Sequence, residues 1–238
     1  MTNSKGQVLV SGSSSGIGLA MTSKLIESGY SVVGLDQTEP AFAMPPERFT
    51  FVPVQLSDSK AMLATLPGMF ESIQGPIRCL INNAGIGKMG FLEQLSVADL
   101  QLVMQVNFMS HALLTKLLLA RLKQQNSLVD IVFIGSEAAL SGARQGSIYC
   151  ASKFAVRGFS QALRQECAKS KVRVTLINPG AVRTPFFDEL DFEPGPLPTN
   201  AIEPDDIAQA LLSVLEMRPG TVIEEMNLSP MTHVWQRK

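Results

Sequence analysis

A tyrosine and a lysine four residues apart, Tyr149 and Lys153, are the pair in this sequence best suited to chemistry. On a helix, side chains at positions i and i+4 lie on the same face, so the phenol and the ammonium would be neighbours. A free phenol ionises at about pH 10, and a nearby cation favours the phenolate and lowers that pKa. The pair therefore predicts an acid/base centre that exchanges a proton with an alcohol or carbonyl oxygen.

Two further polar residues extend this predicted centre. Ser136 follows the apolar run 128–134 and precedes Tyr149 by thirteen residues, so its hydroxyl is expected to bind the substrate oxygen. Asn107 lies inside a long helical pattern although asparagine is a poor helix former, which suggests a functional role such as holding a water linked to Lys153. A capping serine and a surface asparagine are the alternative interpretations.

A glycine-rich turn near the amino terminus predicts a second kind of chemistry. The run from Ser11 to Gly18 has the spacing G-x-x-x-G-x-G between an expected strand and an expected helix. Such glycines let the backbone approach a pyrophosphate, and the helix N-terminus offers free N–H groups to it. Asp36, eighteen residues after Gly18, ends the next apolar run and is expected to bind the adenosine ribose hydroxyls. The alternatives are a plain turn and an exposed turn aspartate.

Short apolar runs alternate with longer amphipathic runs along the chain. We expect strands at residues 8–10, 31–35, 49–54, 79–81, 128–134, 172–177 and 222–228, and helices at 17–28, 97–124, 149–169 and 204–217. This alternation predicts a doubly wound parallel β-sheet with right-handed crossovers, in one α/β domain spanning residues 1–238. Segment 184–200, rich in proline and phenylalanine, breaks the pattern and is expected to be a substrate loop.

Composition narrows the range of functions. The 20 basic and 21 acidic residues give a net charge of −1, which offers no electrostatic reason to expect nucleic acid or an anionic membrane as partner. Two histidines and three separated cysteines form no metal-ligand pattern, and such cysteines indicate reduced thiols in a cytoplasmic protein. The polar start predicts no signal peptide, and no apolar run approaches the roughly 18 residues of a membrane span.

Taken together, the motifs resemble those of the short-chain dehydrogenase/reductase family along nearly the whole chain. The matching pieces are Ser11-Gly12-x-x-x-Gly16-Ile17-Gly18, Asn82-Asn83-Ala84-Gly85, Asn107, Ser136, Tyr149-x-x-x-Lys153 and Pro179-Gly180-Ala181-Val182-Arg183-Thr184. The resemblance implies a Rossmann-type fold and the catalytic tetrad Asn107, Ser136, Tyr149 and Lys153, with Lys153 also binding the nicotinamide ribose.

The resemblance also implies where the cofactor lies. Asn83 would lie against it, Pro179 and Gly180 would flank the nicotinamide, and Thr184 would meet the carboxamide. The full set of implied cofactor-binding residues is Gly12, Ser14, Ser15, Gly16, Ile17, Gly18, Asp36, Gln55, Leu56, Asn83, Ala84, Gly85, Tyr149, Lys153, Pro179, Gly180, Val182 and Thr184.

Three positions depart from the family pattern. Ser11 replaces the usual threonine and keeps its hydroxyl. Gln55 stands where an aspartate often holds the adenine amino group, a contact that the Gln55 amide or the Leu56 backbone can take over. Gly135 stands where a serine is frequent. None of these departures removes a catalytic group.

Substrate contacts are expected around the reaction centre. The expected residues are Ser136, Glu137, Arg144, Gln145, Tyr149, Phe186 and Phe187. The phenylalanines of the substrate loop suggest a partly apolar ligand, whereas segment 224–231 resembles a family subset that acts on small hydroxy acids. The long helices resemble those of family dimers and tetramers, so we expect a homodimer or homotetramer.

Three functions compete. An NAD-dependent oxidoreductase acting on an alcohol or carbonyl is favoured, because the second strand ends in Asp36 and the glycine loop carries no lysine or arginine. An NADP-dependent carbonyl reductase would be expected to carry a basic residue at one of those places. A non-catalytic NAD-binding regulator typically lacks the tyrosine or the lysine, and both are present here.

Overall fold

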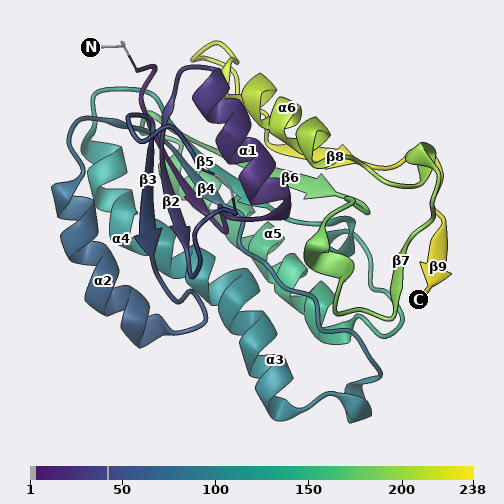
Figure 1. Ribbon diagram of the computed structural model, residues 1–238. Coiled ribbons are helices and arrows are strands. Elements are labelled where there is room, and N and C mark those ends of the chain that lie inside the picture. Colours follow the sequence, from purple (N-terminus) through teal and green to yellow (C-terminus); the bar gives the residue numbers. More distant parts are fainter. Residues whose placement is uncertain (1–3, 42) are drawn as a thin grey trace.

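A seven-stranded parallel sheet forms the centre of the computed structural model, which describes residues 4–41 and 43–238 (Figure 1). Its strands are β1 (Gln7–Ser11), β2 (Ser31–Asp36), β3 (Phe49–Pro53), β4 (Ile77–Asn82), β5 (Val129–Ile134), β6 (Val172–Pro179) and β8 (Glu225–Leu228). They lie in the order β3-β2-β1-β4-β5-β6-β8, and every neighbouring pair is parallel. The strand order reverses between β1 and β4, and the crevice at such a switch point is where dinucleotides bind in open α/β sheets.

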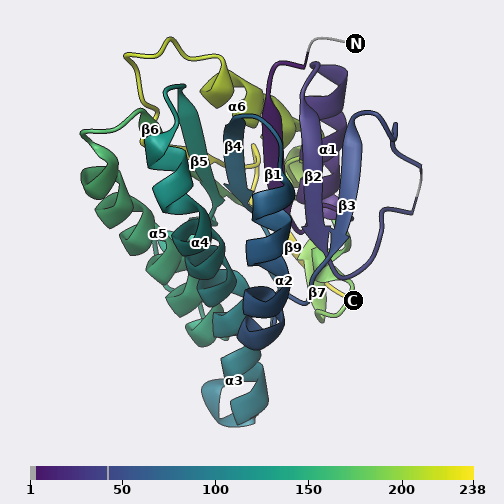
Figure 2. The same ribbon diagram turned by 90° about the vertical axis from the view of Figure 1, so that its left-hand side faces the viewer.

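Helices cover both faces of this sheet (Figure 2). Helices α1 (Gly16–Glu27) and α6 (Pro204–Leu215) pack on one face, where Met21 and Ile207 join the same apolar cluster as Val8. Helices α2 (Ser59–Ser72), α4 (Ser110–Gln124) and α5 (Ser147–Cys167) cover the other face. Strands β5 and β6 are buried at every residue, as expected for parallel strands covered on both sides. The predicted doubly wound, Rossmann-type fold is confirmed.

Helix α2 is the main element that the sequence patterns did not indicate. It contains Pro67 and Gly68, two residues that normally argue against a helix interior. The N-terminus of the helix is nevertheless capped, because the Asp58 carboxylate accepts hydrogen bonds from the Lys60 and Ala61 N–H groups at 2.8 and 3.2 Å. Buried Met62, Leu66 and Phe70 then attach it to the sheet.

The helix expected at 97–124 is continuous but not uniform. It comprises α3 (Val97–Met104), a π-helical turn (Gln105–Met109) and α4. This stretch is long and apolar enough to cross a membrane by length and composition, which corrects the expectation of no such segment. Its inward side chains, Leu114, Leu118 and Leu122, lie in the core cluster beneath the sheet, so the fold already uses this apolar face.

Segment 184–200 is more ordered than the loop expected there. Strand β7 (Phe192–Pro194) pairs antiparallel with β9 (Trp235–Arg237), in a two-stranded ribbon beside the main sheet (Figure 1). The Gly195 N–H also donates to the Val234 carbonyl at 2.8 Å. The carboxyl-terminal segment therefore lies on the expected substrate loop, and this pairing was not predicted.

Candidate active site

A cleft of about 1250 Å³ opens at the carboxyl edge of the sheet, where the strand order reverses. The glycine loop, the ends of β2, β4, β5 and β6, and the β7–β9 ribbon contribute to its walls. Of the predicted site residues, all but Ser14 and Asn107 line this cleft. The fold therefore brings together residues that are widely separated in the sequence.

The glycine loop has the close contacts that only glycine permits. Gly12 has a φ of +68°, and a Cβ there would lie 2.9 Å from the Ala84 Cα. A Cβ on Gly18 would lie 1.8 Å from the Gly12 carbonyl oxygen. Helix α1 follows directly, and its N-cap Ser15 makes no side-chain hydrogen bond to the first turn. The free N–H groups and the positive end of the helix dipole fit a bound pyrophosphate.

Ser11 joins this loop to the wall opposite. Its hydroxyl accepts hydrogen bonds from the N–H groups of Asn83 and Ala84 at 2.9 and 3.2 Å. The Asn83 amide returns hydrogen bonds to the carbonyls of Ser11 and Gly12 at 3.0 and 3.1 Å. The hydroxyl of Ser11 thus forms these bridging hydrogen bonds at the position where threonine is usual.

Asp36 occupies the end of the cleft where the adenosine is expected. Its carboxylate accepts hydrogen bonds from the backbone N–H groups of Ser14 and Gln37 at 3.0 and 2.8 Å. Ser14 itself turns away from the cleft, because its hydroxyl donates to the Thr38 carbonyl. Ser14 is absent from the residues that line the cleft, and its contact with the cofactor stays a prediction. Its backbone instead holds Asp36 in place.

Tyr149 and Lys153 lie side by side on α5, both nearly inaccessible to solvent. The Lys153 Nζ is 5.8 Å from the centroid of the tyrosine ring and donates a hydrogen bond to the Ile134 carbonyl at 3.2 Å. Burial lowers the pKa of Lys153 to about 8.

Burial also raises the pKa of Tyr149 to about 12, although hydrogen bonding with the Ser136 hydroxyl acts in the opposite direction. The expected lowering of this pKa by Lys153 is therefore wrong for the structure as it stands, because the cost of placing a phenolate in the interior dominates. The phenol of Tyr149 is therefore neutral at pH 7.

Ser136 begins a short 3-10 turn at the end of β5. Its hydroxyl accepts from the Ala138 N–H at 3.1 Å, and its own N–H donates to the Asn178 amide oxygen at 3.3 Å. The same amide explains the departure at Gly135, since a Cβ there would lie 2.1 Å from the Asn178 Oδ1. A serine at position 135 would therefore force the Asn178 side chain to shift, and that side chain also holds the Ser136 backbone.

Asn107 lies in the π-helical turn and is completely buried. Its amide oxygen accepts from the Ile86 N–H at 2.9 Å, and its amide nitrogen donates to the Ile86 carbonyl at 3.0 Å and the Ser152 hydroxyl at 3.1 Å. Single π-helical turns occur often at functional sites. The Asn107 side chain thus anchors the backbone at Ile86, in the segment that follows β4. That Asn107 holds a water linked to Lys153 stays a prediction.

One buried histidine escaped the sequence analysis. The His111 Nε2 lies 2.9 Å from the Ala84 carbonyl oxygen, one helical turn beyond Asn107. Burial, reinforced by the charge of Lys153, lowers the pKa of His111 to about 3. The ring is therefore neutral and supports the cofactor wall through Ala84. Only its position four residues after Asn107 could have indicated this role.

Aromatic rings line the substrate half of the cleft. The Phe186 ring lies 5.7 Å from the Tyr149 ring and 5.2 Å from the Phe187 ring, centroid to centroid. Two of the other expected substrate residues, Arg144 and Gln145, are exposed. The Arg144 guanidinium lies 5.1 Å from the Phe91 ring centroid, and Gln145 adopts a left-handed φ of 62°.

The cleft has further lining residues that were not named individually from the sequence. In the carboxyl-terminal segment these include Ser229, Trp235, Gln236 and Arg237, and within the expected substrate loop they include Asp188, Glu189 and Asp191. Near Ser136, Glu137 also meets this segment, with its Oε2 3.9 Å from the His233 Nδ1. Residues after 231 carry no family motif, so only their proximity in the fold reveals them.

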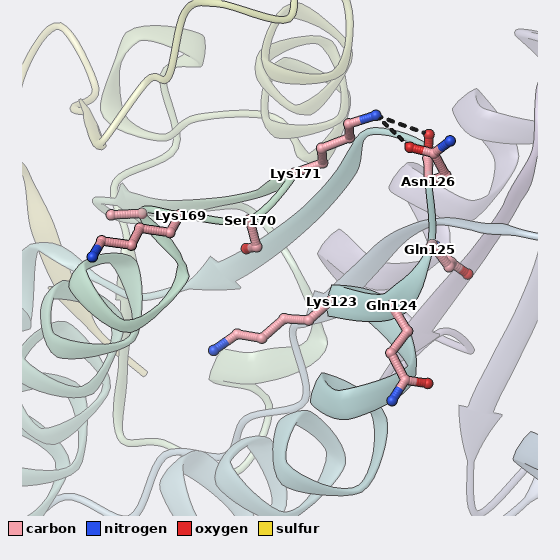
Figure 3. Close-up of a pocket in the computed structure, with 8 residues that line it drawn as sticks. Lys123, Gln124, Gln125, Asn126, Lys169, Ser170 and Lys171 are labelled. Atoms are coloured by element: carbon pink, nitrogen blue, oxygen red, sulfur yellow. Dashed lines mark hydrogen bonds between the residues drawn. The ribbon is translucent and has the colours of Figure 1, made fainter.

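A smaller pocket lies at the opposite edge of the sheet, where β5 and β6 begin (Figure 3). Lysines 123, 169 and 171 surround it. The Lys171 ammonium donates to the Asn126 side chain at 2.6 Å, and the Lys123 ammonium donates to the Glu166 carbonyl at 2.9 Å. Lys171 and Lys123 therefore already form hydrogen bonds with polar groups of the protein. Within residues 4–41 and 43–238, no three His, Cys, Asp or Glu side chains form a metal-binding group.

Comparison with known families agrees with this geometry. The short chain dehydrogenase family profile matches residues 6–194. The chain therefore belongs to the short-chain dehydrogenase/reductase family, and the family resemblance is confirmed. It is an oxidoreductase of this family, whose members bind nicotinamide cofactors.

Several curated relatives are similar to parts or all of the chain. A sepiapterin reductase of Chlorobaculum tepidum is 39% identical over 66% of this chain, and human retinol dehydrogenase 8 is 35% identical over 77%. These alignments span only 62% and 61% of the two relatives' own lengths. A farnesol dehydrogenase of Aedes aegypti is 31% identical over 94% of this chain and 95% of its own.

Solved structures share the fold. A 3-ketoacyl-(acyl-carrier-protein) reductase of Brucella melitensis, complexed with NADH, superposes with a TM-score of 0.82 at 24% identity, over 95% of this chain and 98% of its own. The serine dehydrogenase of Escherichia coli superposes with a TM-score of 0.79 at 25% identity, covering 93% of this chain and 96% of its own.

Proposed function

We propose that this chain is an NAD-dependent oxidoreductase that moves a hydride between the nicotinamide and an alcohol or carbonyl substrate. The observation that carries the proposal is that buried Tyr149 and Lys153 open into the same cleft as the glycine loop. When bound there, the cofactor supplies the hydride donor or acceptor. Tyr149 passes the proton, Ser136 orients the substrate oxygen, and Lys153 binds the nicotinamide ribose.

NAD is proposed over NADP on the basis of charge. Asp36 faces the adenosine end of the cleft, and the basic residues among the described lining residues, Arg144, Lys153 and Arg237, belong to its other half. A carboxylate can accept charge-assisted hydrogen bonds from ribose hydroxyls. A 2′-phosphate at the same place would meet a like charge without a compensating cation. An NADP-dependent carbonyl reductase remains the alternative.

The remaining proposals concern organisation. Residues 1–238 would form one dinucleotide-binding and catalytic domain with the substrate loop at 184–200. Exposed Leu102, Met109 and Phe154, on neighbouring helices, support a homodimer or homotetramer. The three free cysteines support a cytoplasmic location.

The test is Tyr149→Phe, which keeps the ring and removes the proton carrier. We expect turnover to fall by roughly 100- to 10,000-fold while the NADH dissociation constant stays within about threefold. Turnover is followed by NADH absorbance over a panel of alcohols and carbonyls. Tyr30→Phe is the matched control, because Tyr30 is the other tyrosine and lies in the core cluster beneath α1. A Tyr149→Phe enzyme that keeps more than about a tenth of the wild-type rate would exclude the acid/base role.

A further inference from the structure

The carboxyl-terminal segment 229–238 lies beyond the part of the chain that the family profile matches. It nevertheless runs along the cleft. A Cβ on Gly180 would lie 3.0 Å from the Pro230 Cδ, so the segment begins beside the expected nicotinamide site. It continues through the Thr232 N–H, which donates to the Thr199 carbonyl at 3.0 Å, and ends in β9 against β7.

Trp235 is the first residue of β9 and stands opposite Pro194 in the ribbon. Its ring lies 5.3 Å from the Phe192 ring and 5.9 Å from the Phe187 ring. Because Phe187 contacts Phe186, which contacts Tyr149, a continuous row of aromatic rings joins the acid/base tyrosine to Trp235. Trp235 lines the cleft and is 47% exposed, so much of the indole is free to contact a ligand.

Hydrogen bonds after Trp235 tie its strand β9 to the segment around β7. The Lys238 N–H donates to the Asp191 carbonyl at 3.0 Å, and the Gln236 amide donates to the Glu193 carboxylate at 2.7 Å. A large ring held on a paired strand loses little freedom when a ligand covers it. Covering its exposed apolar area removes that area from water, which favours binding.

We infer that Trp235 is a specificity-determining residue that forms the far wall of the substrate pocket and binds the apolar end of an elongated alcohol or carbonyl compound. The inference rests on the proposed function for the identity of the reacting group. The row of rings gives a substrate chain an apolar path away from Tyr149. Short, polar substrates would not reach Trp235.

The protein offers a direct probe, because Trp235 is its single tryptophan. With NADH present, titration of the full chain with 1-octanol should move the tryptophan emission to shorter wavelength in a saturable way, since the alkyl chain excludes water from the indole. Ethanol at equal concentration should leave the emission unchanged. An emission spectrum that 1-octanol does not alter would overturn the inference.

Substitution provides the second measurement. Trp235→Ala should raise KM for 1-octanol roughly tenfold, with kcat and the constants for ethanol little changed. Trp235→Phe should restore KM to within about threefold of wild type. Met231→Ala is the control, because Met231 is on the same segment, is 87% exposed and does not line the cleft.

The two proposals fail in different ways. If no alcohol or carbonyl is turned over by the wild type with either cofactor, the proposed function falls, yet a saturable emission shift with 1-octanol still supports the Trp235 wall. If alcohols are turned over but Trp235→Ala affects ethanol and 1-octanol equally, the proposed function stands and the specificity role is refuted.

Discussion

Gly18→Ala tests whether the glycine loop is shaped for a cofactor or only for a turn. The added methyl would lie 1.8 Å from the Gly12 carbonyl oxygen and 2.6 Å from the Asn83 amide nitrogen. Ordinary contact begins at about 3.4 Å, so the loop and the start of α1 must separate by more than about 1 Å. Overpacking of this kind costs roughly 1–3 kcal/mol of stability. A misplacement of about 1 Å in a binding site can cost roughly 100-fold in rate.

We therefore expect Gly18→Ala to bind NADH at least about tenfold more weakly, measured by cofactor fluorescence, and to unfold at lower guanidinium concentration. Gly68→Ala is the control. Gly68 is an exposed glycine inside α2 with no atom within 4 Å of the added methyl. That change should stabilise the protein by roughly 0.5–1 kcal/mol and leave NADH binding unaltered. Wild-type NADH affinity in Gly18→Ala would refute a cofactor-binding role for the glycine loop, because it would show that the start of α1 can shift without weakening NADH binding.

Three further outcomes follow from charge and burial. Asp36→Asn should reduce the preference for NAD over NADP in kcat/KM, and adding Gln37→Arg should reduce this preference further. Equal use of NAD and NADP by the wild type would show that Asp36 does not select the cofactor. The rate of carbonyl reduction should fall as pH rises through about 8, because buried Lys153 loses its charge there. The Lys153→Met enzyme should be slower and should not show this fall. If the fall in rate near pH 8 persists in Lys153→Met, another group is responsible for it. The pKa of about 3 for His111 keeps it neutral when folded, while the unfolded chain protonates it below pH ~6.5. The free energy of unfolding should therefore drop by about 1.4 kcal/mol per pH unit below that value. Guanidinium titrations of His111→Gln should show a shallower drop with pH. An equal drop in the two proteins would assign the pH dependence to other groups.

The sequence predicted the main sheet well because buried parallel strands are short apolar runs, which can be identified without knowing the strands that they pair with. It predicted Tyr149 and Lys153 as neighbours because their spacing on a helix determines it. It did not predict α2, where Pro67 and Gly68 mask a helix that Asp58 initiates. Nor did it predict the β7–β9 ribbon, because strands of three residues leave no periodic pattern and pair only through the tertiary fold.

The direction of the pKa shift at Tyr149 could not be read from the sequence either, and it bears on how one site can serve both directions of the reaction. Spacing suggested that Lys153 would favour the phenolate, but burial raises the pKa of Tyr149 to about 12 and so favours the phenol. A neutral phenol is the form needed to donate a proton to a carbonyl during reduction. Oxidation of an alcohol needs the phenolate, and a further positive charge in the cleft, such as an oxidised nicotinamide ring, favours that form. Under the proposed function, the charge of the bound cofactor would then bias Tyr149 toward the protonation state that each direction requires, while Lys153 and Ser136 hold the geometry constant.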